Sequence, residues 1–227
     1  MEDKYKLGHR ARTMEKFLKN SENFSKTDIL ELILFFCIPR KDTKIIAKNI
    51  NSKFDTLLSF FSSSNIELNQ IEGFGLNSIV FIKVIYEIAI RISFERIKQK
   101  DIVKNFNDLV VYCKLKVSCL KSEQFRVIFL SAKNHIIKEE VLFFGTITSV
   151  HIYPREIIKK CIDLGSVSIV LVHNHPSGDP TPSSEDIEIT KLLHKTLKTI
   201  NVCVFDHIII SENNFISFRQ NKIPPFL

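Results

Sequence analysis

The pattern of apolar and polar positions predicts a helical first part of the chain. Apolar residues recur at helical spacing before residue 100, and Ser25 with Asp28 matches a capping box ahead of the first apolar run, which Pro39 ends. Helices are expected at residues 29–37, 43–50, 54–61 and 77–98. Their shared interior is expected to contain Leu30, Ile33, Leu34, Ile45, Ile46, Leu57 and Phe60. Residues 1 to about 24 are basic and show no periodicity before Met14, as in a solvated tail.

The second part of the chain mixes strands with helices. Strands are expected at residues 125–130, 135–144, 167–172, 202–210 and 215–218, with 145–150 extending the sheet. Helices are expected at residues 107–116, 154–162 and 183–198. Hairpins interrupt the alternation of strand and helix, so the fold class is predicted to be α+β. The change of pattern near residues 98–106 predicts two domains, an all-helical one over 1–100 and a mixed one over 105–227.

Composition narrows the class of protein. The hydrophobic content of 44% and the charged content of 25% are typical of a globular protein, and charges interrupt every long apolar run. The first residues lack the apolar core of a secretion signal. The five cysteines are scattered and have no C-x-x-C spacing, which argues against disulfides and thiolate zinc sites. We therefore expect a cytoplasmic protein that does not bind membranes.

The net charge of +7 lies mostly in the first part of the chain, with 17 basic and 12 acidic residues up to residue 100 and 15 and 13 after it. This excess is compatible with nucleic-acid binding, but a chain rich in Ile, Lys, Asn and Phe acquires it from composition alone. The segment Ile71–Gly75 before the long helix looks like a helix-hairpin-helix element, a sequence-independent binder of the DNA backbone. Gly73, Gly75 and Lys83 are its candidate DNA contacts, although a Gly-x-Gly segment is also an ordinary tight turn.

Two histidines at the end of a predicted buried strand are the strongest indication of a functional site. His173 and His175 follow the apolar run 167–172, and side chains two residues apart on a strand share a face. A turn rich in Pro and Gly follows, after which Ser183 begins a helix with Asp186 in its first turn. Two imidazoles and one carboxylate leave one position of a tetrahedral zinc ion open, as in catalytic sites.

The motif His173, His175, Pro176, Ser183 and Asp186 resembles that of the JAMM (MPN-type) metalloproteases. The string from His173 to Asp179, with Pro182, Ser183, 154–157 and 206–209, is similar to the bacterial RadC family within that group. The letters H-N-H do not indicate an HNH nuclease, whose residues are dispersed along the chain. The resemblance implies a cytidine-deaminase-like mixed sheet flanked by helices and one zinc ion per chain.

The resemblance also implies a glutamate beside the metal as general base, at the start of the first long strand. Glu123 occupies that place and is preferred, while Glu156 is the alternative. Ser183 is implied to stabilise the oxyanion and can also act as the helix N-cap. Asp179 and Glu185 are acidic neighbours outside the motif, and His207 is interpreted as a structural histidine.

The expected function is that of a zinc metallopeptidase or isopeptidase that hydrolyses an amide bond in a peptide or protein substrate. The alternative is a DNA-associated protein, related to repair or recombination, whose helical domain contacts the DNA backbone. A metal-free scaffold is a third possibility, which the complete ligand set argues against. The sequence identifies neither the substrate nor the oligomeric state.

Overall fold

The computed structural model describes residues 8–38, 42–145 and 153–226. The chain divides into two compact units, Met1–Ile88 and Ala89–Leu227. This division falls inside helix α6, Leu76–Lys98. The domain boundary near residues 100–105 stays a prediction. Among the residues that the structure describes, no helix combines the length and the hydrophobicity needed to cross a lipid bilayer.

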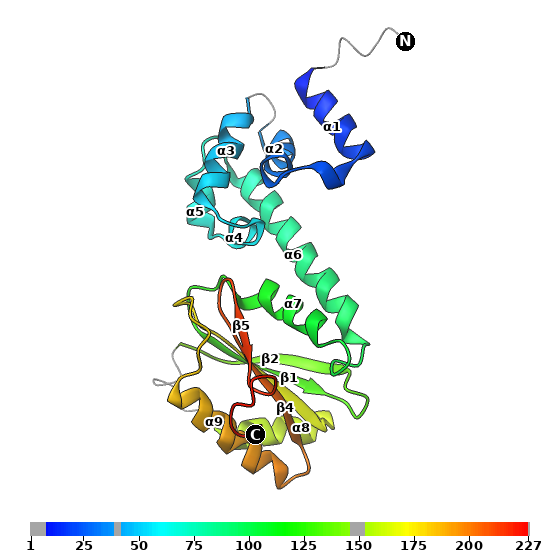
Figure 1. Ribbon diagram of the computed structural model, residues 1–227, viewed down its shortest axis with the longest axis vertical. Helices are drawn as coiled ribbons and strands as arrows, with labels where there is room; N and C mark the ends of the chain where they lie inside the picture. Colours follow the sequence, from blue (N-terminus) through cyan, green and yellow to red (C-terminus); the bar gives the residue numbers. More distant parts are fainter. Residues whose placement is uncertain (1–7, 39–41, 146–152, 227) are drawn as a thin grey trace. The chain divides into compact units, whose positions relative to one another are not determined.

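The first unit is helical, as predicted (Figure 1). It contains α1 (His9–Lys19), the 3-10 helix η1 (Ser21–Asn23), α2 (Lys26–Cys37), α3 (Lys44–Lys53), α4 (Leu57–Ser62), α5 (Asn65–Asn69) and the first part of α6. The capping box is confirmed: the Asp28 N–H donates to Ser25 Oγ over 3.2 Å, and the Ser25 N–H donates to the Asp28 carboxylate over 3.0 Å. The sequence did not predict α1 or α5.

The predicted interior of the first unit is largely confirmed. Leu30, Leu34, Ile46 and Phe60 are buried, with Ile33 and Leu57 packed against them. Ile45 is the exception, because α3 turns Ile46, Ala47 and Ile50 inward and leaves Ile45 65% exposed.

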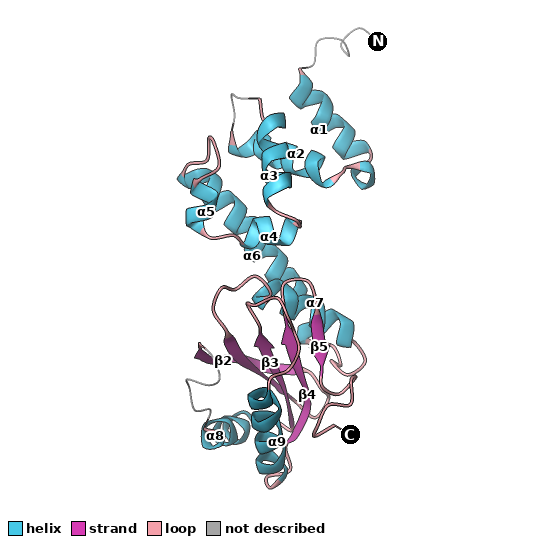
Figure 2. Cartoon of the chain, turned by 60° about the vertical axis from the view of Figure 1, so that its left-hand side comes forward, coloured by secondary structure: helices cyan, strands magenta, loops and turns pink. Residues whose placement is uncertain are grey.

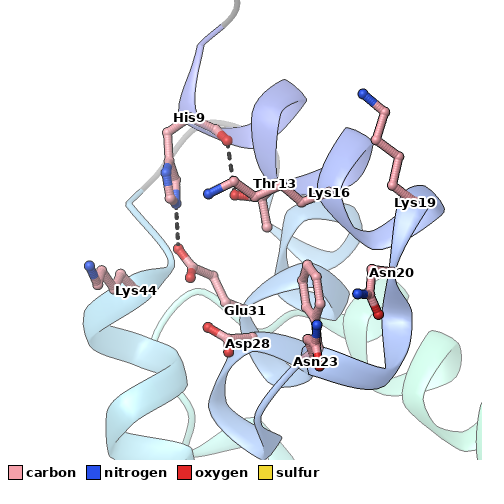
Figure 3. Close-up of a pocket in the computed structure, with 10 residues that line it drawn as sticks. His9, Thr13, Lys16, Lys19, Asn20, Asn23, Asp28, Glu31 and Lys44 are labelled. Carbon is pink, nitrogen blue, oxygen red and sulfur yellow. Dashed lines mark hydrogen bonds and ion pairs between the residues drawn. The ribbon is translucent and has the colours of Figure 1, made fainter.

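The expectation of a solvated tail is wrong for residues 9–19, because α1 docks on α2. The guanidinium of Arg10 donates to the carbonyl oxygens of Phe35 and Ile38 over 3.2 and 2.7 Å, where α2 ends and its carbonyls lack helical partners. His9 Nε2 lies 2.9 Å from Oε1 of the buried Glu31 (Figure 3). The contact between His9 and Glu31 borders a groove of about 500 Å³ that is lined by His9, Thr13, Lys16, Lys19, Glu31 and Lys44, among others. Side chains near the start of the chain therefore have partners in α2, which could not be predicted from a segment without apolar periodicity.

The turn before α6 is a packed part of the first unit. Gly73 has a φ of +79°, and a Cβ at this position would lie 3.1 Å from Ile38 Cδ1. Two polar side chains of α6 bind the neighbouring helices: the Ser78 hydroxyl donates to the Cys37 carbonyl over 3.0 Å, and the Lys83 ammonium donates to the Ser63 carbonyl. Lys83 therefore has a role within the unit, and its contact with DNA stays a prediction, as do those of Gly73 and Gly75.

Replacing Gly73 with Val is expected to destabilise the first unit by about 2 kcal/mol or more, because a β-branched residue would adopt a left-handed φ against Ile38. Thermal unfolding measures the loss. Gly75→Ala is the matched control, since a Cβ at Gly75 meets no atom within 4 Å. Equal stability of both variants would contradict this account. Loss of DNA binding in Gly73→Val would consequently not identify a phosphate contact.

The second unit is an α+β domain, which confirms the predicted fold class (Figure 2). Beyond the end of α6 it contains α7 (Phe106–Val117), β1 (Gln124–Leu130), β2 (Ile136–Phe144), α8 (Pro154–Leu164), β3 (Ser168–Asn174), α9 (Ser184–Lys198), β4 (Cys203–Ile210) and β5 (Phe215–Ser217). The strand order is β2-β1-β3-β4-β5; β3 and β4 pair in parallel, and the other three described pairs are antiparallel. Helix α7 covers one face of the sheet, and α8 and α9 cover the other. The predicted extension over 146–150 lies outside the described residues.

The central strand β3 is buried along its whole length, as the apolar run over 169–172 predicts, and its polar residues Ser168, His173 and Asn174 are buried too. Phe125 of β1 pairs with His173 of β3, so the two side chains share a face of the sheet. Ile169 and Leu171 lie on this same face and pack with residues of α8 and α9. The register therefore directs His173 toward the side of the sheet on which α9 begins.

Candidate metal centre

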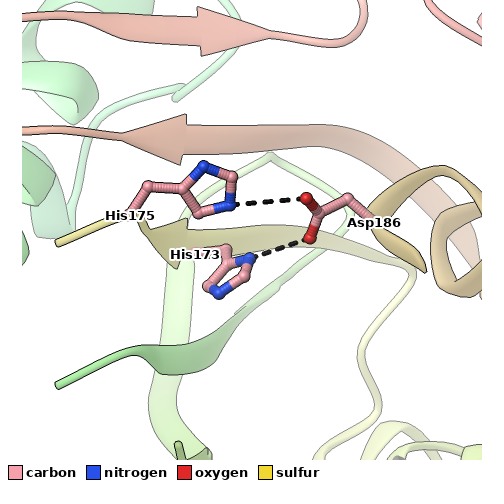
Figure 4. A group of neighbouring side chains, drawn as sticks. All are labelled: His173, His175 and Asp186. Carbon is pink, nitrogen blue, oxygen red and sulfur yellow. Dashed lines mark hydrogen bonds and ion pairs between the residues drawn. The ribbon is translucent and has the colours of Figure 1, made fainter. Parts of the chain in front are cut away.

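Three side chains from the end of β3 and the start of α9 meet in a buried cluster (Figure 4). His173 Nδ1 lies 2.9 Å from Asp186 Oδ1, and His175 Nε2 lies 3.4 Å from Asp186 Oδ2. The three residues offer ligand atoms within 4.8 Å of one another. The structure thus brings together His173, His175 and Asp186, the three residues that the sequence motif singled out as metal ligands.

A capping box fixes the position of Asp186 at the third residue of α9. The Asp186 N–H donates to Ser183 Oγ over 3.1 Å, and the Ser183 N–H donates to Asp186 Oδ2 over 2.8 Å. This confirms the predicted N-cap role of Ser183. The same serine hydroxyl lies 2.7 Å from Asp186 Oδ2, so one carboxylate takes part both in starting the helix and in the cluster.

The position of the hydrogen on the His175 ring indicates that the cluster suits a cation. Its Nδ1 lies 2.9 Å from the Asp179 carbonyl oxygen, which can only accept, so Nδ1 carries the hydrogen. A neutral ring then turns the lone pair of Nε2 toward the Asp186 carboxylate. Two acceptors facing each other repel unless a proton or a metal ion lies between them. A carbonyl partner on the far ring nitrogen is also the usual way in which a metal-binding histidine is oriented.

The pKa values in the cluster agree with this interpretation. Burial lowers the pKa of His175, but its hydrogen bonds to Asp186 and to the Asp179 carbonyl outweigh burial and raise the pKa overall. Burial alone would raise the pKa of Asp186, but hydrogen bonds from both imidazoles and from Ser183 hold it well below its usual range. Asp186 is therefore ionised at neutral pH, in a cluster that attracts positive charge.

Glu123 borders the cluster beside the other ring nitrogen of His173. His173 Nε2 lies 3.9 Å from Glu123 Oε2. This ring nitrogen is buried and has no hydrogen-bond partner among the described residues. The Glu123 side chain is 23% exposed, so it is open to both the cluster and solvent. Glu156, the alternative base, is 57% exposed on α8, where its carboxylate lies 3.3 Å from Arg155 Nε.

The acidic neighbours outside the motif have other partners. The Asp179 carboxylate accepts hydrogen bonds from the backbone and the hydroxyl of Thr181. Glu185 is partly exposed and accepts from the Ser184 hydroxyl. Asp179 reaches the cluster through its backbone carbonyl, which lies 2.9 Å from His175 Nδ1.

His207 is buried behind the cluster, in agreement with its predicted structural role. Its Nδ1 lies 2.7 Å from Thr190 Oγ1, and the Thr190 hydroxyl donates to the Asp186 carbonyl, so these two side chains support the first turn of α9. The His207 ring lies parallel to that of His173, with centroids 6.4 Å apart. Burial holds the pKa of His207 at about 3, with His173 acting in the same direction. Thr190 was missed, although its position one helical turn after Asp186 was a usable signal.

The arrangement of this unit defines a class of protein. A mixed sheet whose central strand ends in His-x-His, with an aspartate at the start of the next helix, is a JAB-type domain with a potential metal site. Residues 103–223 match the family model of the RadC-like JAB domain. Over 231 aligned residues, the chain is 42% identical to a UPF0758 protein of Fusobacterium nucleatum subsp. nucleatum, with 98% of this chain and all of the relative covered. The chain therefore belongs to the RadC (UPF0758) family, and its domain is of the JAMM/MPN hydrolase type.

Proposed function

We propose that this protein is a zinc-dependent hydrolase of amide bonds, a metallopeptidase or isopeptidase that acts on a peptide or protein substrate. The observation that carries the proposal is the cluster of His173, His175 and Asp186, with Glu123 3.9 Å from a ring nitrogen of His173. Two imidazoles and one carboxylate suit zinc and leave a coordination position open.

Each residue around the cluster would have its own role in hydrolysis. A bound divalent ion would supply Lewis acidity, which lowers the pKa of a water molecule to about 7 and polarises the scissile carbonyl. Glu123 would accept the proton of the attacking water and transfer it to the leaving amine. Ser183 would donate its hydroxyl hydrogen to the oxygen that gains negative charge. In the structure this hydroxyl donates to Asp186 Oδ2 over 2.7 Å, so the oxyanion would replace the carboxylate as its acceptor during the reaction.

The cysteines support a cytoplasmic place of action. All five are free, and burial raises the pKa of Cys37 and of Cys161 to about 11, so these two thiols resist ionisation. A chain with free thiols of this kind suits a reducing compartment.

The metal content of the purified protein tests the proposal. Plasma mass spectrometry should find about one zinc ion per wild-type chain and almost none in His173→Ala or Asp186→Ala. Glu185→Ala is the matched control, because Glu185 is the partly exposed acid beside Asp186 in the first turn of α9, and this variant should keep the zinc. A folded wild-type chain that takes up no zinc after reconstitution would overturn the proposal. Retention of zinc by Asp186→Ala would overturn the ligand assignment.

A further inference from the structure

The side chain of Asn174, between the two histidines, makes a set of contacts that the proposed reaction does not use. Asn174 is 1% exposed. Its Oδ1 accepts a hydrogen bond from the Gln124 N–H over 2.7 Å. Its Nδ2 donates to the carbonyl oxygen of Ser122 over 3.1 Å and to that of Leu120 over 3.5 Å. One amide group thus satisfies backbone groups in the segment that leads into β1.

These contacts fix the backbone on both sides of Glu123. The carbonyl of Ser122 belongs to the peptide group before Glu123, and the Gln124 N–H belongs to the one after it. The carbonyl of Glu123 itself accepts from the Gly145 N–H over 2.9 Å. The two peptide groups on either side of the Glu123 Cα are therefore held, the second of them through both its N–H and its carbonyl.

We call the side-chain hydrogen bonds of Asn174 the clamp. The clamp lies where the regular backbone hydrogen bonding between β1 and β3 ends. The last backbone pair of these strands is Phe125 with His173. Beyond it, β3 bonds toward the other side, and the His175 N–H donates to the Ile210 carbonyl over 2.8 Å. The Asn174 side chain therefore continues the attachment of β3 to the start of β1 in place of the backbone.

We infer that Asn174 is a positioning residue that sets Glu123 at a fixed distance from the metal ligands. Neighbouring residues of a strand point to opposite faces, so one short segment carries both ligands on one face and the clamp on the other. Any displacement of His173 and His175 is thus transmitted to the backbone of Glu123. The inference rests on the proposed function, because it assigns Asn174 an effect that acts through Glu123.

The experiment compares Asn174→Ala with Ser166→Ala in the full-length, zinc-loaded protein. Ser166 is a matched control, because its buried hydroxyl lies 3.1 Å from the Leu130 carbonyl and links the opposite ends of the same two strands. Asn174→Ser is a milder second variant, whose side chain is too short to span both peptide groups, and it is used if the alanine variant does not fold. Each variant is tested by amide hydrogen exchange, zinc affinity and turnover.

Three results are expected from Asn174→Ala. Exchange of the Gln124 amide accelerates by about 10-fold, the effect of losing one buried hydrogen bond, while amides in the middle of β3 are unchanged. The zinc Kd stays within about 3-fold of wild type, because no ligand is removed. Turnover of a peptide found by substrate screening falls by about 10- to 100-fold in kcat with little change in KM, since the base is displaced. Ser166→Ala changes neither the Gln124 exchange nor kcat.

A double-mutant cycle separates positioning from general support of the fold. In a Glu123→Gln background, Asn174→Ala should lower kcat no further, because the group it positions is gone. Multiplication of the two losses, or unchanged Gln124 exchange in Asn174→Ala, would overturn the inference. Failure of the proposed function has a different signature: Glu123→Gln itself would leave turnover unchanged, or the wild type would bind no zinc, whatever the exchange of Gln124.

Discussion

Glu123→Gln is expected to lower kcat for amide hydrolysis by about 10²- to 10⁴-fold, the usual worth of a general base. Zinc content should not change, because Glu123 lies 3.9 Å from His173 Nε2 and is not one of the three ligands. Glutamine keeps the shape of the side chain and removes its capacity to accept a proton. The measurement is turnover of a screened peptide substrate, with the zinc content of the same sample determined in parallel.

Glu156→Gln is the matched control for this prediction. It changes the same functional group at the other glutamate that the sequence offered as a base, and Glu156 lies exposed beside Arg155. We expect its kcat to stay within about 3-fold of wild type, as for a surface change remote from the reacting atoms. The opposite pattern, in which Glu156→Gln is inactive and Glu123→Gln is active, would transfer the role of base to α8.

The sheet-containing unit is expected to lose about 2 to 3 kcal/mol of stability from His207 alone when the pH falls from about 6.5 to about 4.5. Burial depresses the pKa of His207 from 6.5 to about 3 in the folded chain. Between these values the unfolded chain binds a proton that the folded chain does not, so acid favours unfolding. The contribution of His207 is complete above pH 6.5 and declines toward pH 3.

His207→Phe provides the comparison, because His207 packs against the rings of Phe125 and Phe218 and a phenyl ring suits that site. Both proteins are measured without metal, so that loss of zinc in acid does not contribute. Urea unfolding, followed by hydrogen exchange of β3 amides, should show a pH dependence about 1 kcal/mol per pH unit steeper in the wild type below pH 6. Parallel dependences would mean that His207 titrates normally in the folded chain.

The sequence predicted most of the second unit because its elements carry strong local signals. The apolar run before His173, the Pro at the start of α8 and the serine at the start of α9 each correspond to an observed boundary. The first unit was harder to predict. α1 has no buried residue and is held by polar contacts such as those of Arg10, which leave no apolar periodicity in the sequence.

The metal ligands could be predicted because strand alternation and helix capping constrain them at short range. The partners that hold the rest of the site come from distant parts of the chain. Asn174 reaches Gln124 across fifty positions, and Thr190 reaches His207 across seventeen. Such pairs depend on which strands become neighbours, and spacing along one sequence does not contain that information. The place of Glu123 beside the cluster was therefore inferred only from the resemblance. The structure explains this place, because the pairing of Phe125 with His173 brings Glu123 near the His173 ring.

The capping box at the start of α9 bears on the entropy that the chain would lose on binding an ion. Ser183 holds the Asp186 carboxylate through two hydrogen bonds, so its rotamer is set by the helix itself. A ligand whose torsions are already fixed gives up little further side-chain entropy when it coordinates. Coordination of a divalent ion by Asp186 would therefore need little rearrangement of this side chain.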